Sequence, residues 1–542
     1  AQMLEVIIED VSIQGKITDE NGEGLPGASV VVKGTTVGAT TNLDGNYKLS
    51  VPEGSIVTIT YVGYLTKDIE VGSQSVIDVQ MELDAAQLEE IVVIGYGTQK
   101  KADLTGSLSS ISGEGLDKMQ IGDPSQLLLG RMAGVRIESA GGSPGASTNI
   151  VVRGVSSLTN SDPLFVIDGM FTDNMDFLNP SDIKSIQVLK DASAAAIYGS
   201  RAAAGVVIVT TRSGDGIDGI RVDFETSIGT QSQIKKLDWL SGAEYAELRN
   251  TLTIANTPAG QQPDLLPGFN SELDPSVSTI IDDIAISSAP MRNSSASVYG
   301  NAGNVNFNVS ANWLDQEGII VASDFDRKTF RANMGMDLGK LQIQETFTVS
   351  STYRTKNTIW NLGNNILPTI PFLNPDNEGG YGGASQELHR QDGNNHIGRA
   401  LLQDRHETKK NILGSINIGY EIIEGLTANV NMGIQYFTTS DYTFNPTFYI
   451  SNNLDANIQN AELRDRTSTY SNQLIEGTVN YKKSFDKHSI EVLGGVTSQK
   501  TETDRGFLWV SGFPSNQIRQ ASAAATIVTA QGTEVVSGLQ SV

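Results

Sequence analysis

Cysteine is absent from the 542 residues of this chain, which excludes disulfide bonds and thiolate metal sites. Histidine occurs only 4 times, and these residues are too scattered to suggest a zinc enzyme. Basic residues are also few, because 38 Lys and Arg stand against 62 Asp and Glu and leave a net charge of −24. Nucleic-acid binding needs clustered basic side chains, so we expect no nucleic-acid partner. The acidity fits either solvated loops or electrostatic selection of a ligand.

Long hydrophobic runs are missing as well. No stretch of roughly 18 apolar residues occurs, so a transmembrane helix is not predicted. A membrane-spanning β-strand needs only about 10 alternating residues, so a membrane location stays open. The chain has 55 glycines and only 6% aromatic residues, a balance that favours strands and turns over helical packing.

Residues 12–83 form the first predicted unit, after an N-terminal extension over residues 1–11. Short β-rich runs alternate with the turn signals NG, PG, DG and EG, a spacing typical of a small β-sandwich. Asp44 and Gly45 lie between TTNL and NYKLSV, and Gly readily takes the positive φ that a hairpin turn needs. We therefore predict a β-sandwich with a hairpin at this position.

Residues 100–213 form a second unit, in which helix and strand signals alternate. Asp123 followed by Pro124 predicts the start of a helix, which we expect to run through QLLLGRMAG to a cap at Gly134. Asn179 and Pro180 repeat the start signal, with IQVLKD expected as the following strand. The apolar run VVIVTT predicts a buried strand later in the same unit.

Polar and apolar residues alternate over long runs from about Arg221 onward. In NFNVSANW, Phe307 and Val309 fall on one face while Asn306 and Asn308 fall on the other. We count about nine such runs, each about 10 or more residues long, which is typical of barrel strands with a lipid face and a polar lumen face. A soluble β-sandwich or repeat protein gives similar alternation in shorter strands. Long polar insertions, near 235–292 and 355–408, separate some runs, and WLSGAEYAELRNTL in the first predicts a short amphipathic helix.

The segment LEEIVVIGYG connects the first two units as an acidic and then apolar extended peptide. The second unit contains the blocks GVRIESAGGSPG, NIVVRGVSS, PLFVIDGM and LKDASAAAIYGSRAAAGVVIVTTRSG. These blocks resemble the plug domain of TonB-dependent outer-membrane transporters, and the connecting segment resembles their Ton box. The first unit looks like the carboxypeptidase-regulatory-like domain that precedes the plug in the SusC-like branch of that family.

The resemblance implies a mainly β fold: an N-terminal β-sandwich, an α/β plug domain and an antiparallel transmembrane β-barrel. The domains would be the β-sandwich at 12–83, the Ton box and linker at 84–99, the plug at 100–213 and barrel strands at 214–542. A barrel that encloses such a plug needs about 22 strands. Because nine strands would leave unpaired edges in lipid, we expect these residues to be the N-terminal portion of a longer barrel.

The resemblance also implies three groups of functional residues. The TonB-binding segment comprises Leu88, Glu89, Glu90, Ile91, Val92, Val93, Ile94, Gly95, Tyr96 and Gly97, although an ordinary edge strand of the sandwich is the alternative. Three arginines in the plug are expected to pair with carboxylates of the barrel: Arg153, Arg201 and Arg212. The substrate-facing candidates are Ser143, Ser157, Asn160, Asp162, Phe171, Asp173, Trp360 and Tyr381.

The function implied by the resemblance is active import of a glycan or other nutrient oligomer across the bacterial outer membrane, without cofactor, metal or enzymatic step. The expected partners are TonB with its ExbB/ExbD motor, a SusD-like surface lipoprotein, outer-membrane lipid and an oligosaccharide or peptide substrate. Two transporter–lipoprotein pairs can also form a dimer, and the N-terminal domain is expected in the periplasm. A secretion- or signalling-associated SusC-like protein is the alternative within the fold, and a soluble β-rich surface adhesin is the alternative from another class.

Overall fold

The chain divides into two units, Ala1–Ser107 and Leu108–Val542, and each is treated by itself. The computed structural model describes the following residues: 10–19, 22–33, 35, 37–52, 54–61, 64–72, 74–82, 91–94, 97–100, 108–112, 122–139, 141–154, 162–191, 195–266, 277–356, 367–384, 395–450, 457–485 and 488–541.

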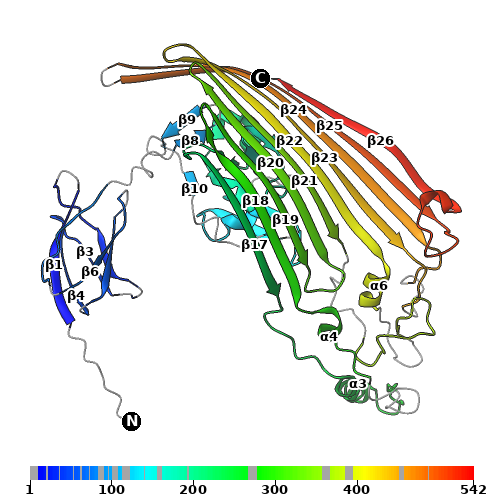
Figure 1. Ribbon diagram of the computed structural model, residues 1–542. Helices are drawn as coiled ribbons and strands as arrows, with labels where there is room; N and C mark the ends of the chain where they lie inside the picture. The colour runs from blue at the N-terminus through cyan, green and yellow to red at the C-terminus, as the bar shows by residue number, and fades with distance from the viewer. Residues whose placement is uncertain are drawn as a thin grey trace. The chain divides into compact units, whose positions relative to one another are not determined.

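Two small sheets in the first unit share one apolar core, with strand orders β4-β1-β7 and β3-β2-β5-β6 (Figure 1). Alternation explains the core, because Tyr47, Leu49 and Val51 of β4 are buried while the residues between them are exposed. Ile13 and Ile17 of β1 and Val30 of β2 meet them in the same core. The strands are β1 (Asp10–Thr18), β2 (Ser29–Val32), β3 (Gly38–Thr40), β4 (Asn46–Pro52), β5 (Ile56–Thr60), β6 (Lys67–Glu70) and β7 (Val79–Gln80).

The turn at Gly45 does not close a hairpin, so that part of the prediction is wrong. Gly45 has the expected positive φ of 82°, and the N–H of Asn42 donates to the carbonyl oxygen of Asn46. However, β3 pairs with β2 and β4 pairs with β1, so the chain crosses from one sheet to the other here. The positive φ at Gly45 was predicted correctly from local sequence. The partners of the flanking strands are decided by tertiary packing, which local sequence does not show.

The connecting segment contains two further strands, β8 (Ile91–Ile94) and β9 (Gly97–Lys100). They pair with each other as an antiparallel hairpin, with Ile91 opposite Lys100. Leu88, Glu89 and Glu90 of the predicted Ton box, and its residues Gly95 and Tyr96, lie outside the described residues. The role of the segment stays a prediction.

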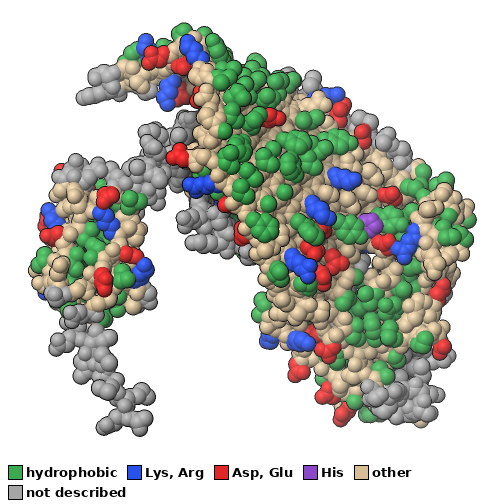
Figure 2. Space-filling view, in the orientation of Figure 1, with side chains coloured by type: hydrophobic (Ala, Val, Ile, Leu, Met, Phe, Trp, Pro, Cys, Tyr) green, Lys and Arg blue, Asp and Glu red, His purple; other side chains and the backbone are tan. Residues whose placement is uncertain are grey.

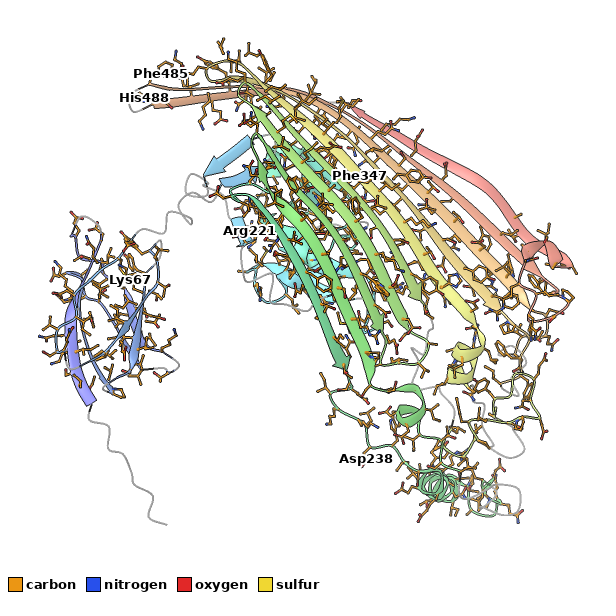
Figure 3. The ribbon with its side chains drawn as sticks, viewed as in Figure 1. Lys67, Arg221, Asp238, Phe347, Phe485 and His488 are labelled. Atoms are coloured by element: carbon orange, nitrogen blue, oxygen red, sulfur yellow. The ribbon has the colours of Figure 1, made fainter. Side chains whose placement is uncertain are left out.

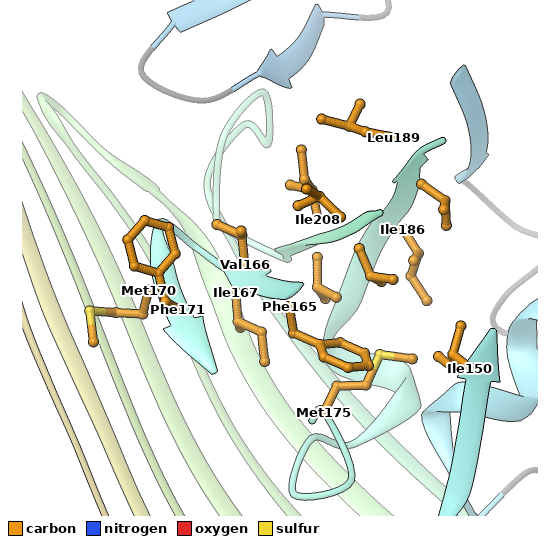
Figure 4. Close-up of a cluster of buried hydrophobic side chains, with 14 of the residues drawn as sticks. Ile150, Phe165, Val166, Ile167, Met170, Phe171, Met175, Ile186, Leu189 and Ile208 are labelled. Carbon is orange, nitrogen blue, oxygen red and sulfur yellow. The ribbon is translucent and has the colours of Figure 1, made fainter. Parts of the chain in front are cut away.

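The plug is built on a five-stranded sheet with the order β10-β15-β16-β13-β14, in which β13 runs parallel to β16. The adjacent strands β13 and β16 carry almost unbroken apolar runs, LFVI and VVIVTT, as expected for strands covered on both faces. Figure 4 shows Phe165, Ile167, Ile186 and Ile208 of this buried cluster. The elements are β10 (Leu108–Ser112), η3 (Pro124–Leu128), β11 (Val135–Ser139), β12 (Thr148–Val152), β13 (Leu164–Ile167), β14 (Met170–Thr172), η4 (Pro180–Asp182), β15 (Ile183–Leu189), η5 (Ala196–Ala202) and β16 (Val206–Thr211).

The helix predicted to reach Gly134 is only the short 3-10 turn η3, which ends at Leu128. Its start is as predicted, since the Asp123 side chain accepts a 2.8 Å hydrogen bond from the N–H of Ser125 and Pro124 opens the turn. Leu127 and Leu128 are both buried in the plug core. The backbone leaves the helical conformation at Leu129, whose φ of −62° and ψ of 120° are extended, so the predicted helix does not continue to Gly134.

The remainder of the second unit is a ten-stranded antiparallel sheet, one strand more than the alternation predicts. Its strands follow chain order: β17 (Ile220–Gln231), β18 (Ala289–Ala302), β19 (Val305–Glu317), β20 (Asp324–Leu338), β21 (Leu341–Thr355), β22 (Asp404–Ile423), β23 (Leu426–Asn445), β24 (Glu462–Phe485), β25 (His488–Ser511) and β26 (Thr526–Ser541). The plug lies against one face of this sheet (Figure 1).

The two ends of the sheet differ in their connections. Tight turns join the strands at one end, where Gly303, Gly339 and Gly425 supply positive φ angles of 67°, 75° and 81°. The long connections 232–288 and 356–403 leave from the opposite end. In Figure 3, Phe485 and His488 mark the tight-turn end and Asp238 marks the long-loop end.

Burial is inverted across this sheet relative to a soluble protein. The side chain of Phe347 in β21 is 38% exposed, whereas its neighbour Thr348 is 1% exposed. The same alternation leaves Val309 exposed on β19 while Asn308 and Ser310 are buried. Hydrophobic side chains gather across the face of the long strands in Figure 2, with charged side chains toward the ends. The apolar-out, polar-in prediction for these strands is confirmed.

The long loops carry the helices of this unit. They are α3 (Gly242–Asn256), α4 (Ile281–Ala285), α6 (His396–Leu402) and the 3-10 turn η8 (Ala521–Ala523). The helix predicted in the first insertion is α3, which begins at a capping box formed by Ser241 and Glu244. A small apolar cluster around Ile370 and Ile397 packs the loops together. In the described part of the chain, every helix is too short or too polar to cross a membrane.

Candidate functional site

A layer of buried polar contacts joins the plug to the inner face of the sheet. At its centre, the guanidinium of Arg331 in β20 forms an ion pair with the Asp168 carboxylate of the plug, and the two side chains are 1% and 8% exposed. Arg331 also donates to the hydroxyl oxygens of Thr348 and Thr211, both at 2.6 Å. Asn333 donates to the Arg212 carbonyl oxygen at 2.7 Å. Because every bond in this layer is polar, water can replace it if the plug moves.

The backbone conformation of the plug places the Asp168 carboxylate next to Arg331. Asp168 follows β13 with a positive φ of 45°, an unusual conformation that Asp tolerates better than most residues. Its carboxylate accepts hydrogen bonds from the N–H of Thr211 at 2.9 Å and from the Thr211 hydroxyl at 2.8 Å. These bonds tie the β13–β14 turn to the end of β16 and fix the carboxylate for Arg331.

A second set of contacts lies around Phe171. Asn472 in β24 donates to the Phe171 carbonyl oxygen at 2.9 Å, and Gln499 in β25 donates to the Asn472 amide oxygen at 2.9 Å. Arg201 of the plug donates to Gln499, and its guanidinium carbon lies 4.3 Å from the centre of the Phe171 ring. This chain of bonds spans two strands from a single plug arginine.

A close steric contact lies beside these bonds. Met170 of the plug projects toward the long strands (Figure 4), where it fits against Gly433 of β23. A Cβ atom at Gly433 would lie 1.9 Å from the Met170 sulfur, so only glycine leaves room for this side chain. Asn431 on the same strand donates to the Gly169 carbonyl oxygen at 3.4 Å. The β13–β14 turn is therefore held by both charge and shape.

A pocket of about 400 Å³ lies between the plug and the sheet. The plug forms one wall with these residues: Gly122, Asp123, Gln126, Ser139, Gly141–Ala146, Asn174, Asp176 and Phe177. The opposite wall consists of side chains from the ends of β17 to β23 that lead into the long loops: Gln231, Met291, Gln316, Phe325, Arg327, Ser350, Thr352, Arg354, Glu407, Lys409, Asn411, Gln435, Phe437 and Thr439. A volume of this size suits one or two units of a small oligomer.

Gly145 brings its plug loop close to the sheet. Its φ is +62°, and a Cβ there would lie 2.2 Å from the Phe325 ring. Arg354 of β21 donates to the Gly145 carbonyl oxygen at 2.9 Å. The Gly-rich stretch around Gly145 thus allows close approach of the backbone to an aromatic ring.

Charged residues of both signs line the pocket. Glu407 lies within ion-pair distance of three cations: Arg354 at 3.6 Å, Lys356 at 3.2 Å and Lys409 at 3.5 Å. Asp441 takes the closest contact to Lys356, at 2.7 Å. The pocket lining itself carries three cations and three carboxylates, so its charges balance: Arg327, Arg354, Lys409, Asp123, Asp176 and Glu407.

Asp176 stands out among the carboxyl groups of the pocket. Burial, and after it the nearby Asp123 carboxylate, raise its pKa from an ordinary 3.8 to about 6, against the opposing effect of surrounding cations. The Asp123 carboxylate accepts hydrogen bonds from the Ser125 N–H at 2.8 Å and from the Thr148 hydroxyl. Asp176 is thus the acid of the pocket that loses its charge most easily.

The substrate-facing candidates fall in different places. Ser143 lines the pocket, in the plug loop that contains Gly145. Asp162 and Asp173 are exposed on the plug. Tyr381 packs against Phe372 among the long loops, with ring centres 5.4 Å apart. Ser157, Asn160 and Trp360 lie outside the described residues.

Phe171 requires a correction. Its side chain is only 4% exposed and belongs to the apolar core of the plug, beneath the guanidinium of Arg201. An aromatic residue in a loop-like motif was read as a ligand contact, but it serves packing. It is not available to a substrate in this structure.

The three arginines predicted to join the plug to the barrel also have different outcomes. Arg153 pairs with Asp191 of the plug itself at 2.5 Å, so its prediction as a plug–barrel contact is corrected. Arg201 reaches the sheet, although its partner Gln499 is an amide rather than a carboxylate. Arg212 meets the sheet through its carbonyl oxygen, which accepts from Asn308 at 3.1 Å and from Asn333.

The main ion pair has the opposite polarity to the prediction, with the arginine on the sheet and the carboxylate on the plug. Arg331 and Asp168 were both missed. One signal was available, because Arg331 falls on the polar face of an alternating strand that must turn toward the lumen. Its partner could not be read, since 163 residues separate the two. Within the described ranges, no three His, Asp or Glu side chains lie close enough to share a metal ion, and His389 lies outside them.

Two family models match the chain. Residues 13–93 match the CarboxypepD_reg-like domain, and residues 100–206 match the TonB-dependent receptor plug domain. The chain is 35% identical over 509 residues to the TonB-dependent receptor P26 of Formosa agariphila. This alignment covers 91% of this chain and 49% of that protein. It is 37% identical over 341 residues to the TonB-dependent receptor SusC of Bacteroides thetaiotaomicron, covering 61% of this chain and 32% of SusC.

A similar solved structure supports the same fold. The RagAB peptide importer in its open-open state aligns with a TM-score of 0.70 at 23% identity, covering 83% of this chain and 53% of that one. The chain spans about half the length of the curated relatives P26 and P3 that it matches.

Proposed function

Because this chain belongs to the SusC-like TonB-dependent transporters, we propose that the protein imports a nutrient oligomer across the bacterial outer membrane without changing it chemically. The observation that carries this proposal is the inverted sheet, with Phe347 exposed on one face and Thr348 buried against the plug on the other. An apolar face of long strands suits lipid, and a polar face suits a water-accessible lumen. A plug seated there by polar contacts can be released and reseated.

The two ends of the sheet give the proposal a direction. Membrane barrels have short turns on the periplasmic side and long loops on the outside. On that rule the pocket, lined by strand residues near the long loops, opens toward the cell exterior above the plug. We assign the pocket to initial capture of a glycan or peptide, under a SusD-like surface lipoprotein that covers the loops.

Energy for release would come from TonB and its ExbB/ExbD motor. The Ton box, Leu88–Gly97, belongs to the linker proposed over residues 84–99, between the domain at 12–83 and the plug at 100–213. TonB would pair with it by strand addition, which binds through the main chain while the peptide stays detachable. In this proposal the first domain lies in the periplasm, and a pull on the linker breaks the polar contacts around Asp168.

Deletion of Leu88–Gly97 tests the proposal in the full-length protein. Cells carrying the deletion should bind substrate at the surface normally and fail to accumulate it. A deletion of Pro258–Asp264, an exposed part of the long loop after α3, serves as a control for folding and insertion, and it should leave energy-dependent uptake measurable. Undiminished uptake without the Ton box would overturn the proposed mechanism. Normal binding without any uptake by the intact protein would favour a signalling role instead.

A further inference from the structure

The charged side chains of the pocket already have partners. Glu407 lies within ion-pair distance of Arg354 at 3.6 Å and of Lys409 at 3.5 Å. The Arg327 guanidinium interacts electrostatically with three carboxyl groups of the plug: Asp123, Asp176 and Asp182. The lining has no surplus of either sign, so a charged ligand would have to compete with these existing contacts.

Two amide side chains of the lining are buried and still have unused hydrogen-bonding capacity. Asn411 in β22 is 8% exposed, Gln435 in β23 is 3% exposed, and both line the pocket. In the part of the chain that the structure describes, neither amide oxygen has a hydrogen-bond partner. Buried polar groups of native proteins are nearly always paired, because an unpaired one loses its hydrogen bonds to water without compensation. These two oxygens can therefore accept from a donor group of a molecule in the pocket.

The strand register places both amides around one aromatic ring. Asn411 pairs directly with Phe437 of β23, and directly opposite residues have Cβ atoms about 5 Å apart. Gln435 and Thr439 lie two positions before and two positions after Phe437 on the same strand, so their side chains share its face. The Phe437 ring stacks on Tyr470 of β24, with ring centres 4.8 Å apart, which holds its orientation. An apolar ring thus has polar groups on three sides.

A sugar ring has the matching surface. Its C–H face is apolar, and the hydroxyl groups around its rim both donate and accept hydrogen bonds, as the Asn and Gln amides do. A peptide N–H can also donate to an amide oxygen, but a peptide backbone has no apolar face with donors around its rim. The paired charges of the lining favour a sugar that carries no charge of its own.

We infer that Asn411, Gln435 and Phe437 form a subsite for a neutral oligosaccharide. The two amide oxygens accept from sugar hydroxyls, and the Phe437 ring packs against the C–H face of the same sugar unit. This inference rests on the proposed import function and names its substrate chemistry.

Calorimetry with the full-length protein, purified in detergent, tests the inference with hexamers. Three are neutral oligosaccharides: maltohexaose, xylohexaose and mannohexaose. The comparison ligands are hexagalacturonate, which adds a carboxylate to each sugar, and a hexaserine peptide with blocked ends, which has hydroxyl groups without sugar rings. At least one neutral sugar should bind about 10-fold or more tightly than either comparison ligand, because it satisfies the amide oxygens without breaking an ion pair.

Two variants test the subsite itself. Asn411→Leu and Gln435→Met keep the approximate size of each side chain and remove its amide, so each should weaken binding of the neutral sugar by about 3- to 10-fold. Each should also raise the melting temperature without sugar, because a buried polar group that lacks a partner is removed. A purely structural role for these amides predicts the opposite change in melting temperature. Asn417→Leu is the matched control, since Asn417 lies on the same strand and face outside the pocket lining, and it should leave the affinity unchanged.

Several outcomes would overturn the inference. Tighter binding of hexagalacturonate or of the hexaserine peptide removes the neutral sugar, and so does a lack of binding by all three neutral hexamers. Unchanged sugar affinity in both variants, or a lower melting temperature with equal losses for every ligand, removes the subsite. The import function survives each of these results, because the loss of energy-dependent uptake on deletion of the Ton box decides it separately.

Discussion

Replacing Asp168 by Asn tests how the plug is held in place. The substitution keeps the size of the side chain and removes the charge that faces Arg331, whose side chain is 1% exposed. The Asp168 oxygens that accept from Thr211 at 2.9 Å and 2.8 Å become one oxygen and one amide donor. One of these bonds is lost, and Arg331 is left buried without its carboxylate.

The expected cost is large on the scale of single substitutions. Removing one member of a buried ion pair costs about 3–5 kcal/mol, mostly as the penalty of an uncompensated buried charge. At about 1.4 kcal/mol for each factor of ten, the ratio of released to seated plug should rise by about 100-fold or more. Replacing both partners, as in Asp168→Asn with Arg331→Met, should recover most of that loss.

Hydrogen exchange of the full-length protein measures this directly. Peptides covering β16, whose last residue Thr211 bonds to Asp168, should exchange faster in Asp168→Asn than in the native protein. Asp215→Asn is the matched control, since Asp215 is an exposed carboxylate shortly after β16 that accepts from the Ser213 hydroxyl at 2.8 Å. Equal protection of β16 in all these variants would refute the idea that the buried pair seats the plug.

Three further predictions follow from other contacts. Gly433→Ala should loosen the plug, because the new Cβ meets the Met170 sulfur. Gly494→Ala should not, because a Cβ at Gly494 has no atom within 4 Å. Hydrogen-exchange rates of the β13–β14 turn compare the two variants. The pKa of Asp176 is raised to about 6 in the folded state, where its charged form is disfavoured. As pH rises from about 4 through 6, this carboxyl group ionises in the unfolded chain before it does so in the folded protein, and the free energy of unfolding falls. Asp176→Asn should therefore raise the melting temperature at pH 8 more than at pH 4, and an equal shift at both would contradict this. Ser241→Ala removes the cap of α3 and should cost the helix about 1 kcal/mol, seen as faster exchange over Gly242–Asn256 without effect on the plug.

The alternation of the strands could be read from the sequence because strand side chains have a period of two. Once Phe330 is placed outward, Arg331 must point inward, and the burial of Arg331 follows. The turn that begins at Asp123 and Pro124 could also be predicted, because its capping interactions are local in sequence. The end of the helix could not be predicted, because no local signal marks the extended backbone at Leu129.

Most residues of the candidate site could not be predicted from the sequence for a related reason. Its cations come from different strands, with Arg327 in β20, Arg354 in β21 and Lys409 in β22, and its acids come partly from the plug. No local pattern reports that these strands meet the Ser139–Ala146 loop. Ser143 was predicted from the resemblance to plug domains and lines the pocket, whereas Phe171 was misassigned because its motif does not reveal burial.

The placement of the sheet in lipid, with the plug on its polar face, can be measured most directly with single cysteines, since this chain has none of its own. Phe347→Cys and Thr352→Cys lie on the same strand, the first exposed on the apolar face and the second lining the pocket. Each variant of the full-length protein is labelled with a fluorophore and reconstituted in bilayers that contain a lipid-borne quencher. The account predicts strong quenching at residue 347 and little at residue 352. Equal quenching at both positions, or none at residue 347, would contradict it.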